Sequence, residues 1–244
     1  MYRSYFKKVM EILNEVLEYE GRNIETAAQI ISDSIKENGI VHVFGCSHAA
    51  IPVEDLFYRA GGLAVISPVF GQELMLNMRP VTRTSQAERM HGYAAVILDG
   101  YKTSPGDVMI VSSNSGRNPV PVEMAMEARK RGMAVIAVTS LEFSKNVSSR
   151  HVSSKRLFEV SDLVIDNRGV FGDAAMELEK LDEKFGPTSN IVTGTILNSI
   201  MVKVVESLVA ENIEPPIFTS ANTDGGEEKN KKLIQKYAGR VSYL

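Results

Sequence analysis

The segment Ser113–Gly116 combines small side chains with hydroxyl and amide groups, a composition that suits an anion-binding turn. It follows an apolar run at residues 107–111 that is typical of a buried strand, and Asn118 and Pro119 suit the N-cap and first turn of a helix. Free backbone N–H groups at a helix start attract negative charge, and serine hydroxyls add donors without adding charge. Because the same residue types also form ordinary βα turns, this segment alone leaves both interpretations open.

Turns of the same kind recur along the chain. A strand predicted at residues 40–45 runs into Ser47 and His48 before a helix that we expect to reach about residue 60. Thr139 and Ser140 end another apolar run, and Ser189 lies in a hydroxyl-bearing turn that opens a long apolar helix to about residue 212. Each of these turns repeats the anion-site pattern of a polar loop before a helix.

Strand-like runs alternate with helical segments throughout the middle of the chain. This alternation predicts an α/β fold, a doubly wound parallel sheet of flavodoxin type with helices on both faces. Right-handed crossovers place the loops that follow the strands at one edge of the sheet, where ligands bind in open α/β folds. The predicted strands span residues 40–45, 63–67, 107–111, 133–138 and 163–165.

The spacing of apolar residues predicts that the chain is divided into three parts. Residues 1–38 are predicted to form a helical hairpin that packs on the main domain or on a dimer partner. Residues 39–213 form the sheet domain, and residues 214–244 a tail with a short helix. Because the N-terminal helices and the long C-terminal helix carry more apolar surface than one sheet face covers, we expect a homodimer.

Composition and motif spacing exclude several classes of function. A net charge of −3 argues against a nucleic-acid partner, and the absence of a long uninterrupted apolar run argues against a membrane protein, so a cytoplasmic location is expected. The single cysteine, Cys46, rules out an internal disulfide. No metal site is expected because no paired histidine spacing occurs. The turn after the first strand is GCSHAA rather than GxGxxG, so no dinucleotide cofactor is expected.

Together, the loop after the first strand (residues 45–49) and the loop Ser113–Gly116 with Asn118 make the sequence resemble the SIS (sugar isomerase) domain family. Residues 139–140 and 186–189 match that family more weakly, and Asn118 stands where the family usually has threonine. The resemblance covers about residues 38–212 and is greatest to an uncharacterised bacterial branch likened to phosphoheptose isomerases. It implies a doubly wound domain that binds a phosphorylated sugar or amino sugar.

The resemblance also implies roles for particular residues. Ser47, Ser113 and Ser115 are assigned to the phosphate, with Asn114 and Asn118 beside them. His48, next to Ser47, is a candidate contact to the sugar, as is Ser189 at the start of the long helix; each of these side chains also has an ordinary structural use in a turn. The residues with an implied role in ligand binding are Ser47, His48, Ser113, Asn114, Ser115, Asn118 and Ser189.

Catalysis would need an acid–base group beside the sugar carbons. Aldose–ketose isomerisation needs a base, usually Glu or His, that moves a proton between adjacent carbons. Phosphoheptose isomerases carry a glutamate ten residues after the loop serine, and here that offset falls on Phe57. Glu73 is then the first candidate base, with His91 and His151 as candidate acids.

Three functions therefore stay open on the sequence. The first is an isomerase acting on a phosphorylated sugar. The second is a phosphosugar-binding or sensing protein without catalysis, for which no acid or histidine would reach the sugar carbons. The third is another reaction of the same fold, a lyase or a deaminase, since a fold does not fix its chemistry.

Overall fold

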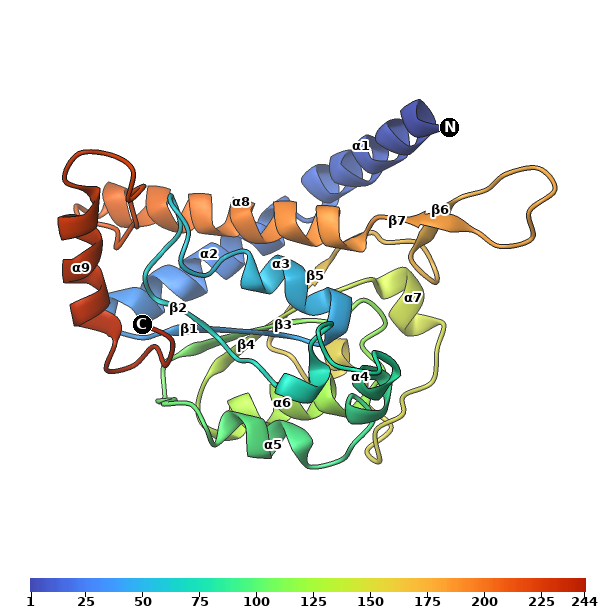
Figure 1. Ribbon diagram of the computed structural model, residues 1–244, viewed down its shortest axis with the longest axis horizontal. Helices are drawn as coiled ribbons and strands as arrows, with labels where there is room; N and C mark the ends of the chain where they lie inside the picture. The colour runs from blue at the N-terminus through green and yellow to red at the C-terminus, as the bar shows by residue number, and fades with distance from the viewer.

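The computed structural model describes residues 1–244 and confirms the predicted α/β fold (Figure 1). A parallel sheet of five strands in the order β2-β1-β3-β4-β5 forms its centre. The central strands are buried along their length because helices cover both faces, which explains their continuous apolar runs. The strands are β1 (Val41–Gly45), β2 (Ile66–Pro68), β3 (Val108–Ser112), β4 (Ala134–Thr139) and β5 (Leu163–Asp166).

One layer of helices packs on the upper face of the sheet in Figure 1. It consists of α2 (Gly21–Lys36), α3 (Ile51–Glu54) and α8 (Ser189–Ala210). Their apolar side chains join those of the sheet in a core of 29 buried residues, which includes Ile31, Ile110 and Leu197. The helix α8 is long and apolar enough to span a membrane, but its buried side lies on this core, so it is a core helix.

A second layer covers the opposite face with α5 (Tyr93–Leu98) and α6 (Pro119–Lys130), seen below the sheet in Figure 1. Its separate core of 20 buried residues includes Phe44, Met109 and Met124. Shorter elements lie between these strands and helices along the chain. They are η1 (Ser47–Ala50), η2 (Gln72–Leu74), α4 (Thr82–Ala87), α7 (Leu141–Lys145) and η3 (Leu157–Glu159).

The N-terminal helices are present as expected, but α1 (Tyr2–Tyr19) extends beyond α2 instead of folding back along it (Figure 1). A single residue, Glu20, separates the two helices. Most of α2 packs within the main domain, whereas α1 exposes the large apolar side chains of Phe6, Met10 and Leu17. The homodimer stays a prediction. The exposed apolar side chains of α1 are the surface that such a dimer interface would cover.

Several predicted boundaries differ from the structure. The helix expected to reach residue 60 ends at Glu54, and the strand expected at residues 63–67 is β2, which begins only at Ile66. The reason for the second difference is that Leu63 pairs with Ile217 of the C-terminal tail instead of with β1. The expected tail helix is present as α9 (Gly226–Tyr237).

An antiparallel hairpin that the sequence did not predict projects from the domain between β5 and α8 (Figure 1). Its strands, β6 (Ala174–Met176) and β7 (Phe185–Pro187), have three residues each. Strands this short carry no readable alternation of apolar and polar residues, which is why the sequence does not predict them.

A buried carboxylate, Asp107, ties the amino end of the sheet to the C-terminal tail. Asp107 is 1% exposed and accepts hydrogen bonds from the backbone N–H groups of Ile40 and Ser104. Arg240 Nη2 donates to both of its oxygens at 2.8 and 2.7 Å, and His42 Nε2 lies 3.3 Å away. Burial acts to raise the pKa of Asp107, but the bonds from these partners outweigh it, so the pKa is lowered from the ordinary 3.8.

We predict that Asp107→Asn lowers the free energy of unfolding by about 3 kcal/mol at neutral pH, because it leaves Arg240 without its anion in a buried network. A carboxylate with a lowered folded-state pKa stabilises the fold above its unfolded pKa and loses that contribution as the pH falls through the folded value. Urea unfolding should therefore show the gap between variant and wild type closing in acid. Asp33→Asn, at an exposed pair with Lys36, is the control and should cost under about 1 kcal/mol. A pH-independent gap for Asp107→Asn would contradict this account.

Candidate functional site

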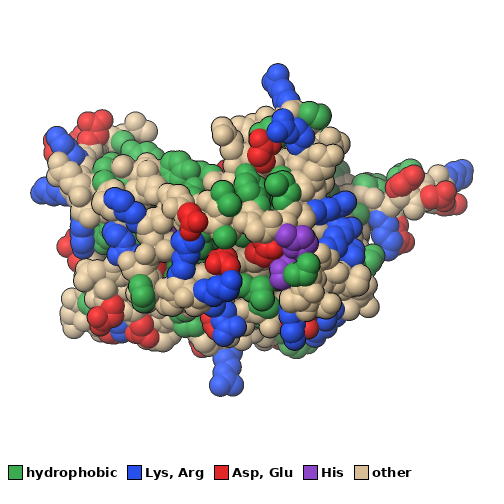
Figure 2. Space-filling model, turned by 90° about the horizontal axis from the view of Figure 1, so that it is seen from below, with side chains coloured by type: hydrophobic (Ala, Val, Ile, Leu, Met, Phe, Trp, Pro, Cys, Tyr) green, Lys and Arg blue, Asp and Glu red, His purple; other side chains and the backbone are tan.

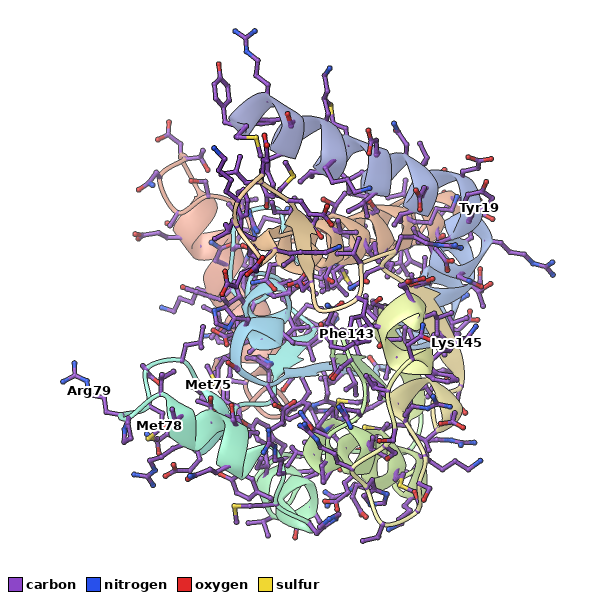
Figure 3. All side chains as sticks on the ribbon, turned by 90° about the vertical axis from the view of Figure 1, so that its right-hand side faces the viewer. Tyr19, Met75, Met78, Arg79, Phe143 and Lys145 are labelled. Atoms are coloured by element: carbon purple, nitrogen blue, oxygen red, sulfur yellow. The ribbon has the colours of Figure 1, made fainter.

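The strand register brings the polar loops to one edge of the sheet. Gly45, the last residue of β1, pairs with Ser112, the last residue of β3, and Ser112 pairs with Val138 of β4. Figure 3 looks at this carboxyl edge, with Phe143 and Lys145 of α7 on one side and the segment that carries Met75 and Met78 on the other. The loops after β1, β3, β4 and β5 therefore begin at nearly the same level.

The loop Ser113–Gly116 is held by its neighbours on the β4 side. The Ser140 N–H donates to the Asn114 carbonyl oxygen at 3.0 Å, and the Thr139 hydroxyl donates to the same oxygen at 3.2 Å. Gly116 has a φ of +57°, and a Cβ there would lie 3.1 Å from Ser144 Oγ. Only glycine satisfies both conditions easily, so this tight turn is fixed by the sequence.

The Asn114 side chain forms part of a buried amide network. Asn167 Nδ2 donates to Asn114 Oδ1 at 3.0 Å and to Thr193 Oγ1 at 3.3 Å, and Asn167 Oδ1 accepts from the Gly169 N–H at 2.9 Å. Asn114 Nδ2 is itself buried and has no partner. A buried donor without an acceptor is costly in a folded chain, so this amide is available to a ligand.

The hydroxyls of the two loops are also free to donate. Ser113 Oγ accepts from the Gly116 N–H at 3.3 Å, and the hydroxyl protons of Ser47, Ser113 and Ser115 have no acceptor within the chain. The backbone N–H groups of Asn114 and Ser115 make no backbone hydrogen bond. Successive free N–H groups beside free hydroxyls form the kind of concave donor set that binds an anion.

The loop after β1 has a sharply bent backbone. Ser47 has a φ of +55°, a conformation that costs energy for a residue other than glycine. Gly45 precedes it, and a Cβ at that position would lie 2.3 Å from the Ala49 carbonyl oxygen, so no side chain fits. His48 follows with its side chain exposed at the same edge. The strained backbone places Ser47 and His48 directly at the end of β1.

Three arginines surround the other end of the β3 loop. Arg150 Nη1 donates to Asn118 Oδ1 at 2.9 Å, and Arg117 donates to the Ser148 carbonyl oxygen at 2.9 Å. Burial and then the positive charges of Arg117 and Arg89 lower the pKa of Arg150. None of the three guanidinium groups forms a salt bridge with a carboxylate. The charge of Glu88 acts on Arg150 without a direct salt bridge, so the positive charge in this part of the edge is offset only in part.

The start of α8 is arranged differently from the sequence-based expectation for Ser189. Asp173 Oδ1 accepts from the N–H groups of Thr188 and Ser189 at 3.2 and 2.9 Å, and Ser189 Oγ donates to Asp173 Oδ2 at 2.6 Å. The carboxylate of the chain thus occupies the helix start that a phosphate would use. Ser189 contributes to a ligand only if Asp173 moves, whereas the buried Thr188 Oγ1 has no partner and is free.

The three candidate catalytic residues, Glu73, His91 and His151, form no hydrogen bond with the serines of the two loops or with Asn114. Glu73 pairs with Arg83 at 3.0 Å and is 39% exposed. His91 Nδ1 lies 3.1 Å from Glu123 Oε1 on the flank of α6. His151, the other candidate acid, lies at the same glutamate. The structure therefore joins the two histidines to each other and not to Glu73.

Glu88, which the sequence did not single out, is a half-buried carboxylate whose charge reaches residues of both the β1 loop and the β3 side. It caps α4, and its charge acts on Cys46 of the β1 loop, while Asn118 and Arg150 of the β3 side act on it in turn. Burial raises the pKa of Glu88, and Asn118 and Arg150 lower it only in part. Burial also raises the pKa of the Cys46 thiol well above its ordinary value, so Cys46 is a neutral packing residue. No motif marks Glu88, because its position depends on how residues 70–89 fold over the edge.

A cleft of about 600 Å³ adjoins these loops between α1, α7 and the loop after β5. Charged side chains of both signs line it, among them Lys8, Glu142 and Arg168. Gly169 belongs to both the cleft and the amide network of Asn167. The cleft offers space beside the donor loops without containing them.

The expectation of no metal site rested on spacing in the sequence. The structure brings together three side chains able to bind a metal, His91, Glu123 and His151, from segments that are about 30 residues apart along the chain. Such a set has no spacing signature in the sequence.

The comparisons with known proteins agree with this architecture. A model of the SIS domain matches residues 4–140. A UPF0309 protein of Oceanobacillus iheyensis is 44% identical over 242 residues, covering 99% of this chain and 98% of the relative, and one of Shouchella clausii is 44% identical, covering 99% and 98%.

Two solved structures illustrate the likeness in fold. A phosphoheptose isomerase from Neisseria gonorrhoeae superposes with a TM-score of 0.57 at 12% identity, covering 84% of this chain and 97% of the isomerase. The NanR protein of Vibrio vulnificus, solved in complex with ManNAc-6P, superposes with a TM-score of 0.54 at 14% identity, covering 96% and 69%. At these identities the likeness shows a shared fold.

We predict that Asn167→Ala lowers the free energy of unfolding by about 2 kcal/mol, because it leaves Asn114 Oδ1 and the Gly169 N–H without partners in a buried network. Asn146→Ala is the control, since that side chain is exposed and makes one bond, to the Glu142 carbonyl oxygen. Urea unfolding of both variants measures the difference. Equal losses for the two variants would show that the network does not hold the loop.

Proposed function

Since the chain belongs to the SIS domain family, we propose that it binds a phosphorylated sugar or amino sugar at the carboxyl edge of the sheet. Ser47, Ser113 and Ser115 bind the phosphate, and Asn114 and Asn118 lie beside it. His48, exposed at the end of β1, contacts the sugar. Proteins of this family bind phosphosugars, and NanR with bound ManNAc-6P is a neighbour in fold.

The observation that carries the proposal is a set of donors without acceptors beside arginines that form no salt bridge. The Ser113 and Ser115 hydroxyls and Asn114 Nδ2 donate to nothing in the chain. A phosphate dianion supplies acceptor oxygens for all of them, and charge-assisted hydrogen bonds are stronger than neutral ones. The guanidinium groups of Arg117 and Arg150 add long-range attraction for the same anion.

Isomerisation is the reaction that we propose for the bound sugar. A base removes the proton from C2 of the aldose while O1 gains a proton, which gives the enediol. The proton then returns to C1 while O2 loses its proton, which gives the ketose. Glu88 suits this base better than Glu73 does, because its raised pKa and its place between the β1 and β3 loops are what such a step needs. Glu73, paired with Arg83, is kept as the comparison.

We predict that the double variant Ser113→Ala with Ser115→Ala binds its phosphosugar about 100-fold more weakly, because two hydrogen bonds to a charged group are lost at about 1.5 kcal/mol each. A thermal-shift screen of wild-type protein against hexose, heptose and N-acetylhexosamine phosphates, each beside its unphosphorylated parent, first identifies the ligand. Titration calorimetry then gives the affinities.

Ser4→Ala with Ser242→Ala is the matched control, since both serines are exposed and lie outside the loops. The control should bind as wild type does. Unchanged affinity in the Ser113 and Ser115 variant would remove these hydroxyls from the site. If no phosphosugar in the panel binds to the wild-type protein, the proposed ligand class is wrong.

We predict that Glu88→Gln keeps phosphosugar binding and loses turnover about 100-fold or more, whereas Glu73→Gln keeps both. The readout is incorporation of solvent deuterium at C1 and C2 of the bound sugar phosphate, followed by NMR in heavy water. The wild-type rate should also fall as the pH drops through the raised pKa of Glu88, because only the carboxylate accepts the proton.

Full exchange in Glu88→Gln would exclude Glu88 as the base, and loss of exchange in Glu73→Gln would assign that role to Glu73. If the wild-type protein binds a phosphosugar and exchanges no deuterium, the chain is a binding or sensing protein of the same ligand class.

A further inference from the structure

We propose that His91, Glu123 and His151 form a binding site for one divalent transition-metal ion of the zinc type. The three residues come from separate segments: the turn before α5, the second turn of α6, and the loop after α7. Their candidate ligand atoms all lie within 4.8 Å of one another. Two histidines and one glutamate are a ligand set that zinc sites use.

The distances suit tetrahedral coordination. Zinc binds histidine nitrogen and carboxylate oxygen at about 2.1 Å, so neighbouring ligand atoms in a tetrahedral site lie about 3.4 Å apart. His91 Nδ1 lies 3.1 Å and His151 Nε2 lies 3.4 Å from Glu123 Oε1. The two imidazole rings lie with centroids 5.5 Å apart and tilted by 45° to each other. Little rearrangement is therefore needed to admit the ion.

The outer contacts of these side chains fix the orientation that a metal needs. Glu123 Oε2 accepts the Gly92 N–H at 2.7 Å, which leaves Oε1 for the ion. His151 Nδ1 lies 2.7 Å from Ser153 Oγ and accepts a long bond from the Ser153 N–H at 3.3 Å. With the metal on Nε2, Nδ1 carries the proton and donates it to the Ser153 hydroxyl in place of the bond from that N–H. Partners of this kind on the outer atoms of metal ligands set tautomer and ring orientation.

The arrangement leaves one coordination position open. His151 and Glu123 side chains are 8% and 13% exposed, whereas His91 is 45% exposed and forms the solvent side of the cluster. Figure 2 shows histidine side chains gathered on this face beside an acidic one. Three protein ligands with an accessible fourth position are typical of zinc sites that hold a water molecule or a ligand.

A metal ion bound at this cluster would be linked to the β3 loop through the segment that carries both Arg150 and His151. His151 follows Arg150, whose guanidinium binds Asn118 at the start of α6. The ion would tie the loop that carries Arg150 to α6, one turn beyond Asn118. Metal binding is therefore expected to hold Arg150 in place, independently of whether the edge binds a phosphosugar.

The test is titration of chelator-treated protein with Zn²⁺, followed by calorimetry, and with Co²⁺, followed by its visible absorption. Wild-type protein should bind one equivalent of zinc, and cobalt should give the intense visible bands of tetrahedral coordination. Glu123→Gln keeps an oxygen for the Gly92 N–H but removes the charge, and His151→Gln removes one nitrogen. Each variant should lower the affinity roughly 100-fold or more.

Glu127→Gln is the matched control, because Glu127 lies one turn further along α6 and pairs only with Lys130. It should bind zinc as wild type does. Circular dichroism confirms that each variant is folded, and Glu123→Gln still tests the proposal if His151→Gln is not. Equal zinc affinity in the control and in the two ligand variants, or no binding by wild type, would overturn the proposal and leave a hydrogen-bonded cluster.

Discussion

The register of the parallel sheet is the constraint on which the rest of this structure depends. Because Gly45 of β1 pairs with Ser112 of β3, the loops that follow the two strands begin side by side. The pairing of Thr139 with Asp166 extends the same level to β4 and β5. A shift of one residue in any of these strands would exchange its faces and also move its loop away from the others. The buried apolar cores on both faces therefore also fix the geometry of the edge.

Electrostatics at this edge is uneven, and that unevenness favours one end for an anion. At the β3 end, Arg117 and Arg150 form no salt bridge with a carboxylate, and Asn114 offers a buried free donor. At the α8 end, Asp173 already occupies the free N–H groups of the helix start. The proposed phosphate site is therefore at the β3 end and not at the start of α8.

The features that depend on local patterns of residues could be predicted from the sequence. Apolar runs predicted the strands and the layer order, and the polar turn at Ser113–Gly116 marked the loop now seen among free donors. Sequence reasoning missed Glu88 and the role of Asp173, because each depends on long segments that fold back over the edge. The cluster around Glu123 was missed for the same reason, since its members meet only after α5, α6 and the loop after α7 pack together.

The most direct test of the account is a crystal structure of the protein with the sugar phosphate identified by thermal shift. We expect the phosphate oxygens to lie within hydrogen-bond distance of Ser47, Ser113 and Ser115, with Asn114 Nδ2 as a further donor. A phosphate bound instead at the start of α8, with Asp173 displaced, or outside the carboxyl edge altogether, would contradict it.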